Sequence, residues 1–300
     1  MLVFLGITLV FAAVLGGYLL EHGNPWVLLQ PAELLIIGGA ALGIVLVANP
    51  STIIRKTFRG AWNVWRAPKH SEHSYVRTLR MLYELFTYGQ RAGMGNLEAD
   101  VDDPKSSPIF SNYPEVLQDH VTLHFICDSM RLLVIGATSS HALDHLMDLD
   151  IEVQRRGRQE PVLALSSVAD SLPGLGIVAA VLGVVITMQS IGGSPATIGE
   201  KVAAALVGTF LGILLCYGVV GPIGARLEHR NEADNQFQQV LRAAIGAYSR
   251  GAPPILAIEY GRRSIPVEVR PTFAEMDINI RREAKVPPVA TPGVFMRPAS

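Results

Sequence analysis

The chain has 300 residues, of which 49% are hydrophobic and 17% charged, and its formal net charge at pH 7 is −1. Its two cysteines exclude the small secreted proteins that depend on a framework of several disulfides. The charge near zero averages apolar and highly charged segments, so it says nothing about partners.

Four stretches of the chain are long and apolar enough to span a membrane, which takes about twenty helical residues for a core of about 30 Å. They cover residues 1–20, 33–54, 172–191 and 202–220. The second has the shortest uninterrupted apolar part, residues 34–48, and is retained because the first span needs a returning partner. We predict an all-α, polytopic membrane protein with four transmembrane helices and a helical cytoplasmic domain.

The expected domains follow from these spans. Residues 1–54 form the first two spans, 55–169 a cytoplasmic helical domain, and 170–222 the third and fourth spans. An amphipathic helix is expected over residues 223–255, and a tail over 256–300. The last twenty or so residues are rich in Pro, Arg and Ala, a composition that predicts disorder.

The basic residues predict the orientation, because loops rich in Lys and Arg remain in the cytoplasm. They follow the second span, precede the third and follow the fourth: Arg55, Lys56, Arg59, Arg66, Lys69, Arg155, Arg156, Arg158, Arg226 and Arg230. The linker over residues 21–32 has none, and the linker over 192–201 has only Lys201. Both termini are therefore expected in the cytoplasm. The first span begins without a basic residue, so we expect it to stay in the protein rather than be cleaved as a signal peptide.

Between the second and third spans the hydrophobic pattern has the helical period. One set is Val76, Leu79, Met81, Leu82, Leu85 and Phe86, and a second is Leu117, Val121, Phe125, Met130 and Leu133. A segment rich in Pro and Asp, residues 100–108, separates the two helices. After the fourth span, residues 226–250 are predicted to form one amphipathic helix that ends at Gly251-Ala252-Pro253-Pro254.

The spans are rich in small residues, which allow helices to approach closely in lipid. Two pairs at a spacing of four are Gly39/Gly43 and Gly208/Gly212. Packing within the chain and packing against further subunits both explain them at this stage.

No acidic, basic or histidine residue lies in the middle of any span, although ion paths usually use one. Glu33 and Asp170 lie at span edges, where we expect water to reach them. The polar groups inside the spans are Thr187, Thr209, Cys216 and Tyr217. A threonine at such a place is usually hydrogen-bonded to its own helix. The protein therefore moves no ions, or it lines a path whose ionisable group comes from a partner.

Pro173 and Pro222 are expected near the cytoplasmic face of the membrane, one at the start of the third span and one just past the end of the fourth. Both places are ordinary for proline. Because they are expected at one depth, we also predict that they form a pliable collar.

The sequence gives little support for an enzyme. His141, Asp144, His145 and Asp148 lie on one helix face with ligand types that suit zinc, but a solvated charged face is the expected reading. No phosphate-binding loop, dinucleotide fingerprint, nucleophile elbow or paired-cysteine motif occurs in the sequence.

Several motifs together resemble the MotA family of flagellar motor stator subunits, in the MotA/TolQ/ExbB proton channel superfamily. The likeness covers nearly the whole chain except the tail. The residues that carry it are Gly16-Gly17-Tyr18, Gln30-Pro31-Ala32-Glu33-Leu34, Gly93-Met94, Leu97-Glu98, Asp170-Ser171-Leu172-Pro173, the block from Val207 to Leu215, and Ala252-Pro253-Pro254.

The resemblance implies a pentamer of this chain around two copies of MotB in the bacterial inner membrane, with no cofactor and no nucleic acid. MotB then supplies the transmembrane aspartate, and proton flow drives torque on the rotor protein FliG. Pro173 and Pro222 match residues implicated in coupling, and Thr209 matches a residue of the proton path, to which we also assign Tyr217. Sodium-driven relatives tend to carry threonine where Ala180 stands. Because alanine offers no oxygen ligand, the expected ion is a proton.

The charged residues that meet the rotor in this family correspond to Glu98 and to a position just before Gly93. The family arginine aligns with Gln90, while Arg91 stands one residue later, so Arg91 is preferred and Gln90 remains open. Ala169 replaces a glycine often found before the aspartate Asp170.

Two other classes of function fit the sequence less well. An energiser of the ExbB/TolQ type, which drives outer-membrane processes, is the alternative, but those relatives have three spans. A transporter with its own substrate site would need helices broken in mid-membrane, and the spans show none.

Overall fold

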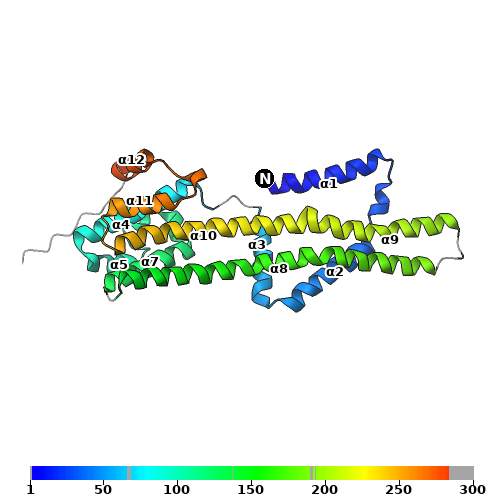
Figure 1. The fold of residues 1–300 in the computed structure, drawn as a ribbon, viewed down its shortest axis with the longest axis horizontal. Helices are drawn as coiled ribbons and strands as arrows, with labels where there is room; N and C mark the ends of the chain where they lie inside the picture. Colours follow the sequence, from blue (N-terminus) through cyan, green and yellow to red (C-terminus); the bar gives the residue numbers. More distant parts are fainter. Residues whose placement is uncertain (1, 66–68, 137, 190–191, 193, 284–300) are drawn as a thin grey trace, which may run out of the picture. The chain divides into compact units, whose positions relative to one another are not determined.

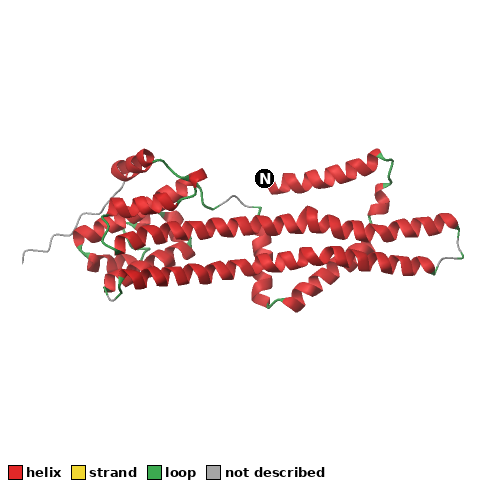
Figure 2. Ribbon diagram, viewed as in Figure 1, coloured by secondary structure: helices red, strands yellow, loops and turns green. Residues whose placement is uncertain are grey.

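The computed structural model describes residues 2–65, 69–136, 138–189, 192 and 194–283 (Figure 1). Within these ranges the regular structure is helical and contains no strand, which confirms the predicted all-α class (Figure 2). Four helical stretches are long and apolar enough to cross a membrane, as the sequence predicted. The disorder predicted for the end of the tail concerns residues that lie almost entirely outside the described ranges.

The chain divides into two compact units. The membrane unit contains Met1–Ala67 and Arg156–Asn231, and the helical unit contains Pro68–Arg155 and Glu232–Ser300. Two long helices, α8 (Ser140–Met188) and α10 (Gly221–Ser249), contribute to both units. The domain boundaries expected at residues 169/170 and 222/223 therefore fall inside continuous helices.

The membrane unit contains the four spans and their connections. Helix α1 (Leu2–Leu20) is followed by the short η1 (Pro25–Leu28) and by α2 (Pro31–Ala48). Helix α9 (Pro195–Leu215) is continued by η4 (Cys216–Val220) and then by α10. Pro31 and Pro195 stand in the first turns of their helices, where the missing N–H costs nothing.

The two prolines expected at span ends have different places. Pro173 lies inside α8, together with Pro161, rather than at the start of a helix. Pro222 is the second residue of α10 and follows η4, a π-helical turn in which Gly221 N–H donates to Cys216 O. A proline inside a helix lacks the N–H that would bond four residues back. The wider π turn keeps the chain helical up to Pro222, and α10 continues beyond it, so the helix does not end at this proline.

Helix α3 (Ser51–Asn63) follows α2 after Asn49 and Pro50 and runs across α8 and α10 in the membrane unit (Figure 1). One face packs on these helices, since Thr57 is buried and a Cβ added to Gly60 would lie 3.1 Å from Leu227. The side chains of Arg55, Phe58, Arg59 and Trp62 are exposed together on the opposite side of the helix. An exposed face with aromatic and basic side chains beside a membrane span is typical of a helix that lies at the membrane surface.

The core of the helical unit is built around α4 (Glu72–Ala92). The side chains that the period of three to four predicted there are buried, which confirms the first helix. The remaining helices of this unit outside α8 and α10 are η2 (Met94–Leu97), α5 (Glu98–Asp102), η3 (Phe110–Asn112), α6 (Pro114–Gln118), α7 (His120–Ile135), α11 (Pro254–Ser264), η5 (Val267–Val269) and α12 (Phe273–Glu283). Helix α4 therefore contributes a continuous buried face to a core that its neighbours complete.

The second predicted helix is divided into α6 and α7. Phe125 and Met130 are buried as expected, but Val121 is 46% exposed. The chain leaves helical geometry at Asp119, between α6 and α7, and this break changes which positions of the pattern face the core. The helix predicted over residues 226–250 is confirmed as part of α10, and the chain turns at Gly251, whose φ of 88° suits glycine.

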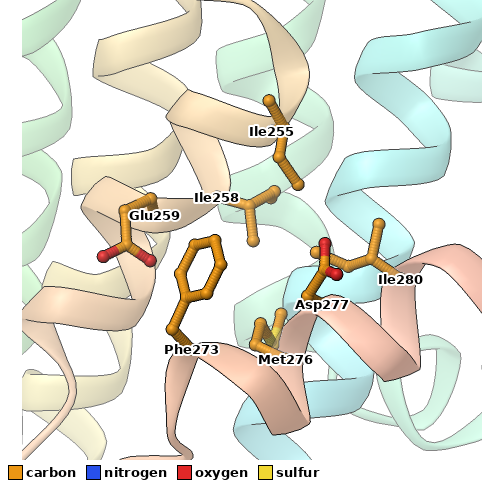
Figure 3. Close-up of a pocket in the computed structure, with 7 residues that line it drawn as sticks. All are labelled: Ile255, Ile258, Glu259, Phe273, Met276, Asp277 and Ile280. Carbon is orange, nitrogen blue, oxygen red and sulfur yellow. The ribbon is translucent and has the colours of Figure 1, made fainter.

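Helices α11 and α12, which the sequence interpretation did not expect, are joined by an ion-pair cluster and an apolar contact. Glu259 accepts hydrogen bonds from Arg262 at 2.7 and 2.8 Å and from Arg263 at 2.7 Å. Arg262 also donates to the Pro271 carbonyl at 2.9 Å, just before α12. Figure 3 shows Phe273 and Met276 of α12 facing Ile258 of α11 beside this carboxylate. The cluster therefore fixes the connection between the two helices.

Replacing Glu259 with glutamine is expected to lower the melting temperature at neutral pH, and less so in acid. The hydrogen bonds from Arg262, and then those from Arg263, lower the pKa of Glu259 from 4.5 to about 2, against burial. A carboxylate with a lowered pKa stabilises the fold above its unfolded value and loses that effect as pH falls through the folded value. The difference between wild type and variant should therefore shrink as pH falls from 4.5 towards about 2.

Thermal unfolding followed by circular dichroism at several pH values measures this difference. Glu268→Gln, at an exposed position of η5, is the matched control and should leave the melting temperature unchanged. A deficit of Glu259→Gln that is the same at every pH would contradict the prediction.

Candidate functional site

The membrane unit is organised by a close contact between α8 and α9, which run side by side (Figure 1). A Cβ atom added to Gly176 would lie 2.7 Å from the Gly208 carbonyl oxygen, and one added to Gly212 would lie 2.5 Å from the Leu172 carbonyl oxygen. Farther along the pair, a Cβ added to Gly183 would lie 2.6 Å from the Cβ of Ala205. No larger side chain fits at these positions, so the two backbones touch without side chains between them.

This contact answers the question that the small-residue pairs left open. Gly208 and Gly212 pack against α8 of the same chain. By contrast, a Cβ added to Gly39 or Gly43 of α2 would meet nothing within 4 Å among the described residues. The Gly208/Gly212 pair therefore serves packing within the chain, and the Gly39/Gly43 pair does not.

The sequence-predicted residues Thr209, Ala180 and Tyr217 lie along this helix pair. Thr209 is half-buried, and a Cβ added to Gly176 would lie 3.2 Å from its Cα atom. Ala180 is also half-buried, next to the fully buried Ala179. Tyr217, in η4, is 74% exposed. Thr209 thus stands where the backbones of α8 and α9 meet, which fixes its Cα position.

Pro173 and Pro222 do not lie level with each other along the helix pair. Along the antiparallel pair, Gly212 faces Leu172, whereas a Cβ added to Gly224 would lie 3.7 Å from Leu165. Pro222 is therefore level with a point about six residues before Pro173 on α8, a separation of about 9 Å at 1.5 Å per residue. The predicted collar at a single level is wrong, and each proline affects a different turn of the pair.

Glu33 is the residue that sequence reasoning misplaced. It was expected at a span edge in contact with water, but its side chain is buried, with 7% of the residue exposed. Glu33, Ile37, Ala41 and Val45 are spaced four apart and form the buried face of α2. That spacing, with small and apolar residues following the acid, was the signal in the sequence.

The carboxyl group of Glu33 lies against glycines of both α8 and α9. A Cβ added to Gly208 would overlap Glu33 Oε2, and one added to Gly183 would lie 3.6 Å from Oε1. Oε2 is buried and has no hydrogen-bond partner among the described residues. The membrane unit therefore contains an acid of its own, in a recess formed by the absence of side chains.

A second group of predicted residues lies in the helical unit, where α4 ends. Gly93, with a φ of 92°, ends α4 and starts the turn into η2. A Cβ added to Gly89 would lie 2.6 Å from Leu97 Cδ1, so glycine there allows η2 to fold back on α4. The Tyr248 hydroxyl donates to the Phe86 carbonyl at 3.1 Å, and the two rings stack with centroids 4.2 Å apart.

The contacts of Gly89 and Tyr248 hold the backbone where α4 ends, while the polar side chains nearby remain exposed. Gln90 and Arg91, at the end of α4, are both exposed, as is Glu98 at the start of α5. The helix end therefore presents these three side chains to solvent on an anchored backbone. Because Gln90 and Arg91 are both exposed, exposure does not identify which of them meets a partner.

The acids of the His/Asp face on α8 form ion pairs with Arg242 of α10 and with Arg250, the residue after α10. Asp148 accepts from Arg242 at 2.6 Å, and Asp144 pairs with Arg250. His141 and His145 are exposed. In the ranges that the structure describes, no group of three or more His, Cys, Asp or Glu side chains is placed to hold a metal ion.

Comparison with known proteins agrees with this arrangement. Residues 4–93 match the family described as Motility protein A N-terminal, and residues 117–239 match the MotA/TolQ/ExbB proton channel family. Motility protein A of Salmonella typhimurium is 38% identical over 281 residues, which cover 94% of this chain and 95% of that protein. The chain belongs to the motility protein A family.

Two further relatives extend the comparison. The chemotaxis protein LafT of Vibrio parahaemolyticus is 36% identical over 274 residues, covering 91% of this chain and 96% of LafT. The fold matches a solved structure of MotAB from C. jejuni with a TM-score of 0.73 at 19% identity, covering 89% of this chain and 96% of that one. Membership of the motility protein A family thus agrees with the four spans and with the α8–α9 pair.

Replacing Gly176 with alanine is expected to destabilise the protein, because the new methyl group would overlap the backbone of α9. Overpacking of this kind typically costs about 1–3 kcal/mol. Gly174→Ala, two residues away on α8, is the matched control, since a Cβ there meets nothing within 4 Å. Alanine also has the higher helix propensity, so the control should melt at or slightly above the wild-type temperature.

The melting temperatures of the purified, detergent-solubilised variants measure this effect. Equal melting temperatures for Gly176→Ala and Gly174→Ala would show that the two helices do not touch as the structure places them.

Proposed function

We propose that this chain is a stator subunit of the bacterial flagellar motor, which forms a proton-conducting complex with MotB and couples proton flow to torque on the rotor protein FliG. The observation that carries the proposal is the 38% identity to a motility protein A over 94% of the chain. The two family matches, over residues 4–93 and 117–239, contain nearly all of both span pairs. The membrane unit and the exposed helix end correspond to the two tasks of such a subunit, ion conduction and contact with the rotor.

MotB is the proposed source of the ionisable group that lies on the proton path. Two solved structures that share this fold are of MotAB, one from C. jejuni and one a flagellar stator complex from Bacillus subtilis. On the α8–α9 pair, Thr209, Ala180 and Tyr217 provide a half-buried to exposed surface without an acid of their own. A partner helix carrying an aspartate would complete this surface, and Pro173 and Pro222 would transmit its protonation along α8 and α10.

Several copies of the chain, proposed to be five, would surround MotB. The unused glycines of α2 support this, since a Cβ added to Gly38, Gly39 or Gly43 would meet nothing within 4 Å in the part of the chain that the structure describes. Glycine faces are suited to close helix contacts in lipid. We propose that the ring lies in the inner membrane with both termini in the cytoplasm, which fits the exposed Arg55 and Arg59 on α3 and the basic residues after α9.

The proposed ion is a proton. Sodium must exchange its hydration shell for oxygen ligands, and Ala180 supplies none. No cofactor is needed for this task, and we do not propose an enzymatic activity.

The energiser alternative has less support. Energisers of the ExbB/TolQ type have three spans, whereas this chain has four. Residues 4–93, which contain the first two spans, match the Motility protein A N-terminal family. The exposed side chains of Glu98 and of Arg91 or Gln90 give this chain a surface suited to a charged rotor partner.

Charge reversal at Glu98 is expected to reduce swimming strongly without preventing insertion into the membrane. The side chain is exposed, so lysine is accommodated, but it would repel the basic side of a complementary partner. A strain deleted for this chain is complemented with wild type, with Glu98→Lys, or with the control Glu268→Lys at another exposed acid. Swimming speed and the amount of protein in the membrane are measured.

The same strain tests the ion. Wild-type complementation should restore swimming without sodium, and a protonophore should stop it. Swimming that requires sodium would contradict the proposal that the coupling ion is a proton. A deletion strain that swims normally but is impaired in outer-membrane uptake would favour the energiser function.

A further inference from the structure

Glu33 has no role in the proton path proposed above, yet it is the buried acid of the membrane unit. Its side chain leaves α2 near the start of that helix and enters the contact between α8 and α9. The residues that flank the carboxyl group are Gly183 on α8 and Gly208 on α9, with Ala179 and Ala205 beside these glycines. None of these four side chains titrates or carries charge.

A charged carboxylate would be poorly accommodated at this place. Transfer of an ionised group into an apolar environment is costly unless a cation or several hydrogen bonds compensate, and Oε2 has neither among the described residues. A neutral carboxylic acid fits the same recess far better, because it carries no net charge and can donate its proton to an oxygen.

The recess is specific for this side chain. Glycine is required at position 208, since a Cβ there would overlap Oε2 and lie 3.0 Å from the Cβ of Ala179, whereas a Cβ at Gly183 would lie at an ordinary contact distance of 3.6 Å from Oε1. The remaining buried positions of α2, Ile37, Ala41 and Val45, fill the same face with apolar groups. An apolar residue at position 33 would complete that face with ordinary packing, so the acid is not needed for packing alone.

We propose that Glu33 is a positioning residue that is carried as the neutral acid, holds α2 against the α8–α9 pair in that form, and releases it on ionisation. Gly208 precedes Thr209 directly, so the contact made by Glu33 restrains the turn of α9 that carries Thr209. Ionisation would draw the carboxylate towards water and loosen this restraint. The effect on Thr209 rests on the proposed stator function, whereas the protonation state and the helix contact do not.

The first test measures the protonation state. The full chain is purified in complex with MotB and reconstituted in lipid, and infrared spectra of wild type and Glu33→Gln are compared at neutral pH. The wild type should show the carbonyl-stretch band of a protonated carboxyl group, and this band should be lost in Glu33→Gln. Spectra without any such difference would show that Glu33 is ionised and would overturn the proposal.

The second test measures the helix contact by hydrogen–deuterium exchange, corrected for the intrinsic effect of pH. As pH rises, peptides that contain α2 should lose protection in wild type, because ionisation releases the helix. Glu33→Gln, which has the same size and cannot ionise, should keep its protection. A loss of protection that is the same in both proteins would refute release by ionisation, and no loss in wild type would do so as well.

A pair of substitutions checks that the contact is the one described. Gly208→Ala should reduce protection of α2, because its methyl group displaces the Glu33 carboxyl group, whereas Gly38→Ala, which meets nothing within 4 Å, should not. Glu33→Ala combined with Gly208→Ala should recover part of the loss, since the overlapping group is gone. Failure of the double variant to recover any protection would place the carboxyl group elsewhere.

Motility then tests the effect on Thr209. Glu33→Gln should assemble at wild-type level and reduce swimming speed, because the restraint on α9 can no longer be released. If the spectra and the exchange agree with the proposal but the cells swim normally, the link to the proton path fails while the neutral acid stands. If deletion of the chain leaves swimming intact, the proposed function fails instead.

Discussion

The backbone contact between α8 and α9 is the constraint on which the membrane unit depends. In lipid, the hydrophobic effect does not drive helices together, so association relies on close van der Waals contact and on hydrogen bonds. Glycines at positions 176, 183, 208 and 212 provide that contact by removing side chains from the interface. They also create the recess that Glu33 enters, so the same absence of side chains determines both the helix pair and the environment of the buried acid.

The two candidate sites are built in opposite ways, each suited to its solvent. In the membrane unit, positions are determined by small residues that allow backbones to touch. In the helical unit, large side chains such as Phe86 and Tyr248 pack around α4 and hold the backbone of η2, while Arg91 and Glu98 remain exposed. A surface for a charged partner requires this combination, because exposed side chains bind with a defined geometry only if their backbone is fixed.

The sequence predicted the number of spans, the all-α class and the helix over residues 226–250, since long apolar or periodic stretches are determined by local composition. It did not predict that α8 continues through Pro173, because the cost of a proline inside a helix is offset by tertiary packing that a local rule does not include. The burial of Glu33 was missed for a similar reason. Its position in the chain is a span edge, and only the packing of α2 on Gly183 and Gly208 encloses it.

Helix α3 makes the preceding helix α2 sensitive to the thickness of the bilayer. It follows α2 directly and lies across α8 and α10, with Phe58 and Trp62 exposed (Figure 1). An aromatic helix at the membrane surface anchors the end of the span that precedes it. Helix α2 has 18 residues and is about 27 Å long, slightly less than a typical hydrocarbon core. A thicker bilayer therefore produces hydrophobic mismatch first at α2, so lipid composition acts on the helix that carries Glu33.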